Sequence, residues 1–177
     1  MPRAVFLDRD GVINSPIMRE GKPFSPHSID QVKIYKEVQE SVVKLKQSNF
    51  EIVVVTNQPE ISRGNLTLIK VNDIHNHITK KTGITNFYIC PHDDNQNCYC
   101  RKPKPGLLYD AVVDLNIDLK GSYMIGDRWR DVDAGNNAGC EQTYFINRHY
   151  DEPLPSKPYS EVKSLSEAVE QILENMQ

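Results

Sequence analysis

The sequence predicts an α/β protein with a doubly wound parallel sheet, on the strength of two observations. Short apolar segments that suit buried strands alternate with segments of helical periodicity, an order that favours a parallel sheet with helices on both faces. Several apolar segments end directly in polar motifs, as expected where ligands bind beyond the carboxyl ends of parallel strands. The 177 residues suit one hydrophobic core and show no internal repeat, so residues 1–177 are expected to form a single domain.

The expected elements follow from the spacing of apolar residues. Strands are expected at the apolar or β-branched runs 4–7, 51–55, 87–89, 122–125 and 143–146. Helices are expected where apolar residues recur on one face, at 36–48, 67–82, 106–116, from about 131, and at 164–176. Loops are expected at 14–30, 58–66 and 150–160, where prolines interrupt the pattern. No insertion is long enough to form a large cap domain.

Composition and charge are those of an ordinary globular protein, with 38% apolar residues, 25% charged residues and a net charge of -3. A nucleic-acid-binding protein usually has a basic balance, so we expect no nucleic-acid partner. No apolar run approaches the roughly 20 residues that span a bilayer, and the chain opens on a strand-like segment rather than a signal peptide. We therefore expect a cytoplasmic monomer with no membrane partner.

Three of the four cysteines cluster with a histidine in the pattern Cys-x-His-x5-Cys-x-Cys, made by Cys90, His92, Cys98 and Cys100. These side chains complete a tetrahedral zinc site and leave no position for water. In a cytosolic enzyme such a cluster is more often metal-binding than disulfide-bonded. We expect a structural zinc ion in the loop 90–100; one disulfide, or a set of reduced and unrelated residues, is the alternative.

Two polar runs follow the first two expected strands. In the Asp-Arg-Asp-Gly run at 8–11, carboxylates at i and i+2 can approach one metal ion, and one can act as a nucleophile while the other transfers a proton. A turn is the alternative, because Asp and Gly are common turn residues. The Thr-Asn-Gln run at 56–58 can donate hydrogen bonds to phosphoryl oxygens, or can merely cap a turn.

Two further runs carry charge. The Arg-Lys-Pro-Lys-Pro-Gly run at 101–106 is stiffened by its prolines and suits an anion, with a solvated loop as the alternative. In the run at 126–131, Asp127 and Asp131 are four residues apart, and their oxygens suit Mg²⁺, with helix capping as the alternative. His75 and His77 have a poor spacing for metal ligands, so we expect them to be exposed or partly packed.

Together these motifs resemble the haloacid dehalogenase superfamily of phosphatases. The resemblance extends from Val5 to about Ile146, and four motifs occur in the order and at the strand ends that the superfamily has. Asp8-x-Asp10-Gly11 resembles the first motif. The other three are matched by Thr56, by Lys102, and by Asp127 together with Asp131.

The resemblance implies a mechanism and a set of site residues. Asp8 would attack phosphorus and form an aspartyl phosphate, while Asp10 would protonate the leaving oxygen and then activate water. Mg²⁺ would be held by Asp8, the Asp10 main-chain carbonyl and Asp127. Thr56 and Lys102 would complete the catalytic set. The residues expected to bind substrate are Asn57, Gln58, Arg63, Arg101 and Arg128.

The zinc cluster followed by Cys-Arg-Lys-Pro is similar to the branch of phosphatases that act on heptose 1,7-bisphosphate and on histidinol phosphate. The Ile-Ser-Arg-Gly run at 61–64 and the Lys-Pro-Gly run at 104–106 favour a sugar bisphosphate of the heptose type, hydrolysed at its 7-phosphate. The short spacer between His92 and Cys98 favours histidinol phosphate. A nucleic-acid 3′-phosphatase is disfavoured by the acidic net charge, and a catalytically silent zinc-binding module by the presence of Asp8. We expect a small phosphorylated metabolite as the substrate.

Overall fold

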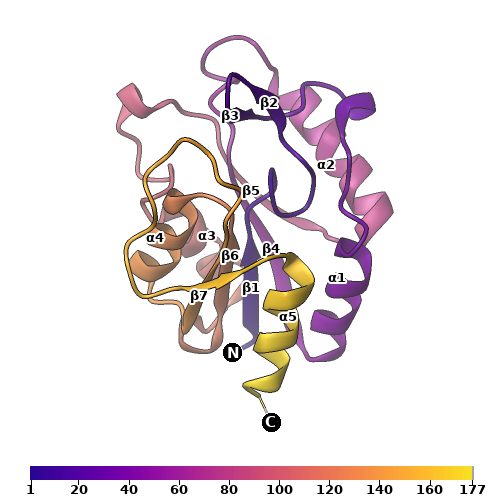
Figure 1. The fold of residues 1–177 in the computed structure, drawn as a ribbon, viewed down its shortest axis with the longest axis vertical. Helices are drawn as coiled ribbons and strands as arrows, with labels where there is room; N and C mark the ends of the chain where they lie inside the picture. The colour runs from indigo at the N-terminus through magenta and orange to yellow at the C-terminus, as the bar shows by residue number, and fades with distance from the viewer. Residues whose placement is uncertain (177) are drawn as a thin grey trace.

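The computed structural model describes residues 1–176, in which a six-stranded parallel sheet has the order β5-β4-β1-β6-β7-β8 (Figure 1). The chain proceeds in one direction across the sheet from β1 to β5 and in the other from β6 to β8. The sheet is therefore doubly wound, and its direction switches between the neighbours β1 and β6. The strands are β1 Arg3–Leu7, β4 Phe50–Asn57, β5 Asn86–Cys90, β6 Tyr123–Gly126, β7 Gln142–Ile146 and β8 Ser160–Val162.

Helices cover both faces of the sheet. Alternate residues of β1 point to opposite faces: Val5 and Leu7 pack in the core under α1, α2 and α5, and Ala4 and Phe6 in the core under α3 and α4. Figure 1 shows the two groups of helices on either side of the sheet. The helices are α1 Val38–Gln47, α2 Leu68–Thr82, α3 Gly106–Leu115, α4 Trp129–Ala138 and α5 Leu165–Glu174, with short 3-10 turns η1 Ile29–Gln31, η2 Asp94–Gln96 and η3 Leu119–Gly121.

The predicted fold class is confirmed, and the differences are local. The expected loop at 14–30 contains a hairpin of β2 Ile17–Arg19 and β3 Lys22–Phe24, and the expected loop at 150–160 leads into β8. These strands are three residues long and contain only one buried residue, Val162, so they lack the apolar run from which the longer strands could be predicted. Helix α4 begins at Trp129 rather than near 131.

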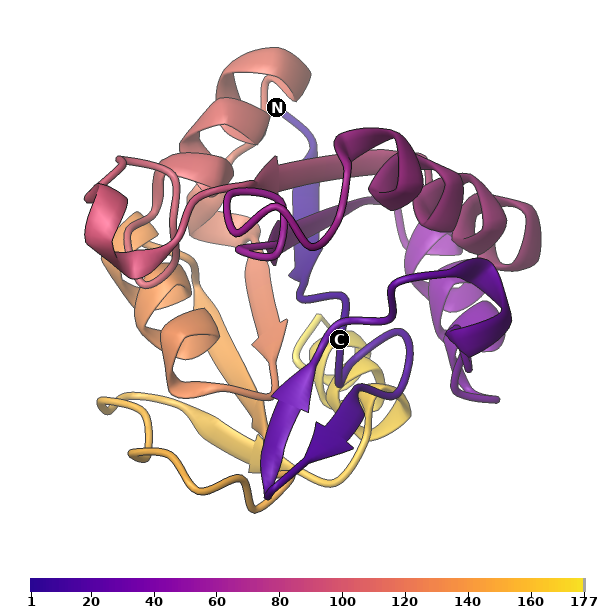
Figure 2. The ribbon, with the colours of Figure 1, turned by 90° about the horizontal axis from the view of Figure 1, so that it is seen from above.

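The carboxyl ends of β1, β4 and β6 meet at one edge of the sheet, and the β2–β3 hairpin lies over that edge. Figure 2, seen from above, shows the hairpin beside the segment that connects β7 to β8. Within residues 1–176, no helix is long and apolar enough to cross a membrane.

Candidate active site

Three buried carboxylates converge where β1 and β6 end. Asp8 follows β1, Asp127 follows β6, and Asp131 lies in the first turn of α4. Each offers an oxygen within 4.8 Å of the others. Among the described residues, the buried Oδ1 of Asp127 has no hydrogen-bond partner. An unpartnered anionic oxygen facing two other carboxylates fits a cation, and Mg²⁺ prefers such ligands.

The pKa values of these groups reflect the crowding. Burial, and then the nearby Asp131, raise the pKa of Asp8 to about 6. Burial and the negative charge of Asp8 also raise the pKa of Asp127 well above its usual range. Both shifts show that the ionised cluster is short of positive charge, which a bound divalent cation would supply.

Lys102 supplies part of that charge. Its side chain is buried, and its ammonium contacts Asp8 Oδ1 at 2.7 Å, Asp131 Oδ1 at 2.7 Å and the carbonyl oxygen of Val55 at 2.6 Å. Although burial alone lowers a lysine pKa, the two carboxylates raise the pKa of Lys102. The ammonium therefore stays charged, with its three protons directed to three oxygens.

Asp131 caps helix α4, one of the two roles that the sequence left open, and it also binds Lys102. Its Oδ2 accepts hydrogen bonds from the backbone nitrogens of Asp127 at 3.2 Å and Arg128 at 3.0 Å, which caps the start of α4. Its Oδ1 holds Lys102. This capping explains why α4 begins two residues earlier than the sequence indicated.

Gly11 is required by the close approach of two loops. Its φ of 97° lies in the left-handed region, and a Cβ atom there would overlap the carboxylate of Asp127. Only glycine avoids both problems.

Asp10 is held by an unusually complete set of donors. Arg9 donates to both carboxylate oxygens, from Nε at 3.1 Å and Nη2 at 2.9 Å. Asn14 at 2.9 Å, Ser25 at 2.7 Å and Gln58 at 3.1 Å complete the set. Burial acts to raise the pKa of Asp10, but Arg9 and the other donors lower it overall. The carboxylate is therefore fixed in one orientation beside Asp8 and Lys102 in a single pocket.

The residues at the carboxyl end of β4 form hydrogen bonds to residues that line this pocket. Thr56 is buried, and its hydroxyl accepts a hydrogen bond from Gln58 at 2.9 Å. Gln58 itself is fully buried, so its amide reaches Asp10 and Thr56 instead of lining the pocket. Asn57 does line the pocket, and its amide exchanges two hydrogen bonds of 3.1 Å with the backbone of Lys102.

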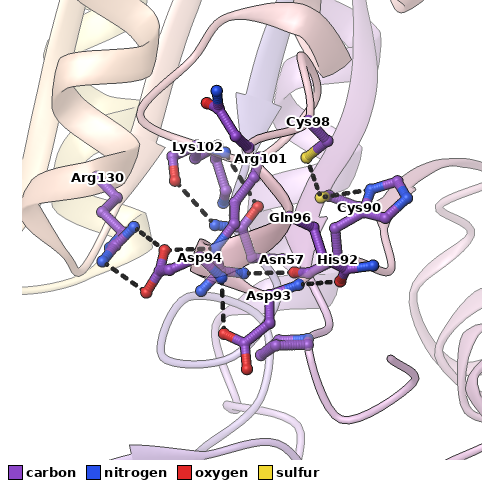
Figure 3. A network of polar contacts seen from close by, with 12 residues as sticks. Asn57, Cys90, His92, Asp93, Asp94, Gln96, Cys98, Arg101, Lys102 and Arg130 are labelled. Carbon is purple, nitrogen blue, oxygen red and sulfur yellow. Dashed lines mark hydrogen bonds and ion pairs between the residues drawn. The ribbon is translucent and has the colours of Figure 1, made fainter. Parts of the chain in front are cut away.

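Four arginines surround an adjoining cavity, and each is paired with a carboxylate. Arg63 contacts Asp93 and Glu60, and Arg128 contacts Glu152. Arg101 and Arg130 share Asp94, each at 2.8 Å (Figure 3). The three arginines predicted to bind substrate, Arg63, Arg101 and Arg128, thus lie around one cavity together with Arg130, which was not predicted from the sequence.

The cysteine cluster is assembled as the sequence predicted. The sulfur of Cys100 lies 3.3 Å from that of Cys90, 3.6 Å from that of Cys98 and 3.4 Å from His92 Nδ1. All four cysteines of the chain are free. The sulfur–sulfur distances suit ligands around one tetrahedral ion with bonds of about 2.3 Å. Figure 3 shows Cys90, Cys98 and His92 beside Arg101, whose guanidinium donates to the carbonyl of His92 at 3.0 Å.

Comparison with known proteins identifies the family. A family model described as HAD-hydrolase-like matches residues 99–145. D-glycero-beta-D-manno-heptose-1,7-bisphosphate 7-phosphatase of Pasteurella multocida (strain Pm70) is 34% identical over 157 residues, which cover 82% of each chain. The chain belongs to the haloacid dehalogenase superfamily of phosphatases. It is a phosphoric monoester hydrolase, as its relatives in this superfamily are.

Two other members of the superfamily extend the comparison. D-glycero-alpha-D-manno-heptose-1,7-bisphosphate 7-phosphatase of Photorhabdus laumondii is 29% identical, over 88% of each chain. The crystal structure of D,D-heptose 1.7-bisphosphate phosphatase from B. bronchiseptica, complexed with magnesium and phosphate, superposes with a TM-score of 0.83 at 27% identity. The superposition covers 98% of this chain and 99% of that one.

Some residues around this phosphatase site could not be singled out from the sequence. Tyr150 donates to Asp127 Oδ2 at 2.7 Å from a segment expected to be a loop. The prediction that His75 is exposed or partly packed is wrong, because it is only 4% exposed and contacts Arg9. Arg9, which His75 contacts, is itself fully buried. Buried arginines are rare unless they are paired with a carboxylate. The adjacent Asp10 was therefore the one signal in the sequence that Arg9 could be buried.

Proposed function

We propose that this phosphatase hydrolyses the 7-phosphate of D-glycero-D-manno-heptose 1,7-bisphosphate, with Asp8 as the nucleophile. The reaction is supported above all by the buried cluster of Asp8, Asp127 and Asp131 with Lys102 between them. The substrate is supported by the names of relatives that act on the beta and alpha forms of this bisphosphate.

The chemistry would proceed in two steps. An oxygen of Asp8 attacks phosphorus, the bond to the sugar oxygen breaks, and Asp10 gives its proton to that oxygen. Asp10 then takes a proton from water, which attacks the phosphorus of the aspartyl phosphate and releases Asp8 with inorganic phosphate. The donors around Asp10 lower its pKa in the free enzyme. Asp10 would take up the proton that it transfers from water as the substrate binds, because the negative charge of the phosphate raises its proton affinity.

Mg²⁺ fits beside Asp8 and Asp127, because the buried Oδ1 of Asp127 has no hydrogen-bond partner among the described residues. The main-chain carbonyl of Asp10 is the third protein ligand in this proposal. When bound, Mg²⁺ would neutralise charge on the transferring phosphoryl group. Lys102, Thr56 and Asn57 would orient that group.

Zinc is proposed as the structural ion held by Cys90, His92, Cys98 and Cys100. The polar loop 90–100 contributes mainly its cysteines to the core, and a metal ion would fix it in place. The loop carries Asp93 and Asp94, which orient the arginines of the adjoining cavity.

Those arginines would bind the distal phosphate of a bisphosphate. Arg101, Arg128 and Arg63 have carboxylate partners in the structure, and a phosphate would compete with these partners by forming similar bidentate contacts. Histidinol phosphate is the second candidate, because Glu60, Asp94, Asp151 and Glu152 line the same cavity and could attract its cationic amine. We also propose a cytoplasmic monomer without membrane partners. The net charge of -3 supports the absence of a nucleic-acid partner.

The deciding experiment compares kcat/KM for heptose 1,7-bisphosphate and for histidinol phosphate. We expect the bisphosphate to be preferred, and Arg101→Ala to impair it far more than p-nitrophenyl phosphate. A preference for histidinol phosphate would overturn the substrate. Asp8→Asn serves as the control for the reaction, because it should fold with an unchanged circular dichroism spectrum and release no phosphate.

The zinc proposal has a separate test. Purified protein should contain about one zinc ion per chain that persists when Mg²⁺ is exchanged. Cys98→Ser should lose the ion and lower the thermal stability, whereas Cys140→Ser should keep it. Normally folded protein without zinc, after expression in zinc-supplemented medium, would contradict the assignment.

A further inference from the structure

Arg9 lies between Asp10 and His75 in a buried chain of hydrogen bonds behind the active site. Its side chain is fully buried. Two of its nitrogens hold the two carboxylate oxygens of Asp10, and the third, Nη1, lies 3.1 Å from Nε2 of His75. The guanidinium is planar and rigid, so a contact at Nη1 also fixes the plane in which the other two nitrogens point.

His75 is placed for this contact by helix α2 and by strand β5. It lies on the buried face of α2, where its ring stacks on Phe87 with 4.3 Å between centroids and 15° between planes. Arginine nitrogens only donate hydrogen bonds, so Nε2 of His75 must accept and its proton lies on Nδ1. Burial and the adjacent Arg9 lower the pKa of His75 to about 3, which keeps the ring neutral and able to accept.

We propose that His75 is a positioning residue for the proton transfer at Asp10: by accepting from Arg9 Nη1, it fixes the guanidinium that holds both oxygens of the Asp10 carboxyl. This inference rests on the proposed function, in which Asp10 protonates the leaving oxygen. No atom of His75 takes part in the reaction, and none reaches the pocket that contains Asp8 and Asp10.

Packing alone does not require a histidine here. A leucine could fill the space against Phe87, but it would leave a buried arginine nitrogen without its acceptor, and the guanidinium would turn toward another oxygen. Since Asp10 accepts from Arg9 at both oxygens, such a turn would misdirect the carboxyl. Small displacements of an acid–base group lower catalysis strongly because proton transfer depends on hydrogen-bond geometry.

The test compares two substrates that differ in their need for an acid. The leaving group of an alkyl phosphate, such as the 7-phosphate of heptose 1,7-bisphosphate, is a strongly basic alkoxide unless Asp10 protonates it, whereas p-nitrophenolate leaves readily without a proton. For His75→Leu we expect kcat/KM on the alkyl phosphate to fall about 10- to 100-fold, as a partial loss of acid catalysis. We expect kcat/KM on p-nitrophenyl phosphate to change less than about threefold. This quantity covers only the steps up to departure of the leaving group, so the later attack of water, which Asp10 assists for both substrates, does not enter it.

Three variants separate positioning from packing. His75→Gln offers an acceptor in place of Nε2 and should restore most of the activity on the alkyl phosphate. Ile78→Val, one turn along the same buried face of α2, should reduce stability slightly and leave the ratio of the two activities unchanged. Arg9→Lys keeps the charge but cannot bridge Asp10 and His75 in one plane, so it should reproduce the His75→Leu pattern, and it provides the test if His75→Leu does not fold.

Equal losses on both substrates, or no loss on either, would overturn the inference while leaving the proposed function intact. Failure of the proposed function would look different, because wild-type enzyme would then not hydrolyse heptose 1,7-bisphosphate, or Asp8→Asn would retain activity on it.

Discussion

A single lysine determines the charge balance around the nucleophile. Lys102 joins Asp8 and Asp131 through contacts of 2.7 Å, while no ion pair to Asp127 occurs among the described residues 1–176. The backbone of Lys102 is in turn held by Asn57. A residue that the motif assigns to phosphate binding therefore also stabilises the fold around the carboxylate cluster.

The first prediction follows from this double role. Lys102→Met should abolish turnover and lower the free energy of unfolding by about 3–5 kcal/mol, the usual cost of leaving buried carboxylates without their partner. Lys120→Met, on the exposed turn η3, is the matched control and should alter neither. Urea denaturation and phosphate release should be measured on the same preparations of both variants. If the two variants behave alike, the role of Lys102 is refuted.

The second prediction concerns the backbone at Gly11. Gly11→Ala should raise the Mg²⁺ concentration needed for half-maximal activity, because the added methyl group displaces the carboxylate of Asp127. Gly64→Ala controls for backbone strain, since Gly64 has a similarly positive φ of 76° but open space around it. A Mg²⁺ titration that shifts equally for both variants would assign the effect to strain alone.

At the scale of elements, the segment between β7 and β8 forms hydrogen bonds to residues of the site. Its alternate residues reach three different parts of the site. Arg148 donates to the Gly11 carbonyl at 3.0 and 3.1 Å, Tyr150 donates to Asp127, and Glu152 accepts from Arg128. The loops that hold the carboxylate cluster are thus tied to a segment that carries no catalytic motif.

The third prediction tests this connection. Tyr150→Phe removes one hydrogen bond to Asp127 and should raise the Mg²⁺ concentration for half-maximal activity by roughly fivefold, the equivalent of about 1 kcal/mol. Tyr159 lies in the same connection, and its ring packs on Phe145 of β7. Tyr159→Phe is the control and should leave the titration unchanged. An unaltered titration for Tyr150→Phe would show that Asp127 needs no support from this segment.

The sequence predicts the site residues at strand ends but not those that this segment contributes. Asp8, Thr56 and Asp127 could be brought together from sequence, because each follows an apolar run and the carboxyl ends of parallel strands share an edge. Tyr150 and Arg130 could not, because Tyr150 lies in a proline-rich connection without a motif and Arg130 depends on its partner Asp94 in the zinc loop. His75 was misjudged since helical spacing alone does not reveal a buried arginine across the core.

At the scale of the whole molecule, the fold concentrates negative charge at one edge of the sheet. The chain has a net charge of only -3, yet three buried carboxylates meet at the switch point between β1 and β6. The doubly wound topology brings strand ends from two halves of the sheet to this point. Bringing these buried carboxylates together makes their ionised forms less favourable, and the pKa values of Asp8 and Asp127 are raised as a result.

The fourth prediction is that stabilisation by Mg²⁺ grows with pH. The pKa of Asp8 is about 6 in the folded chain against an ordinary value of 3.8, so between these values the folded state binds more protons than the unfolded state. Without divalent cations, the contribution of Asp8 to stability is therefore lost as pH rises through this window. Mg²⁺ competes with these protons, and its stabilising effect should be larger above pH 6 than below it.

Thermal unfolding, measured with and without Mg²⁺ at about pH 5.5 and about pH 7.5, tests this linkage. The increase in Tm on adding Mg²⁺ should be clearly greater at the higher pH, while zinc stays bound at both. In Asp127→Asn, which removes one ionised group of the cluster, the Mg²⁺ effect should shrink at both pH values. An increase in Tm that is the same at both pH values in the wild type would mean that the carboxylate cluster does not exchange its protons for the metal ion.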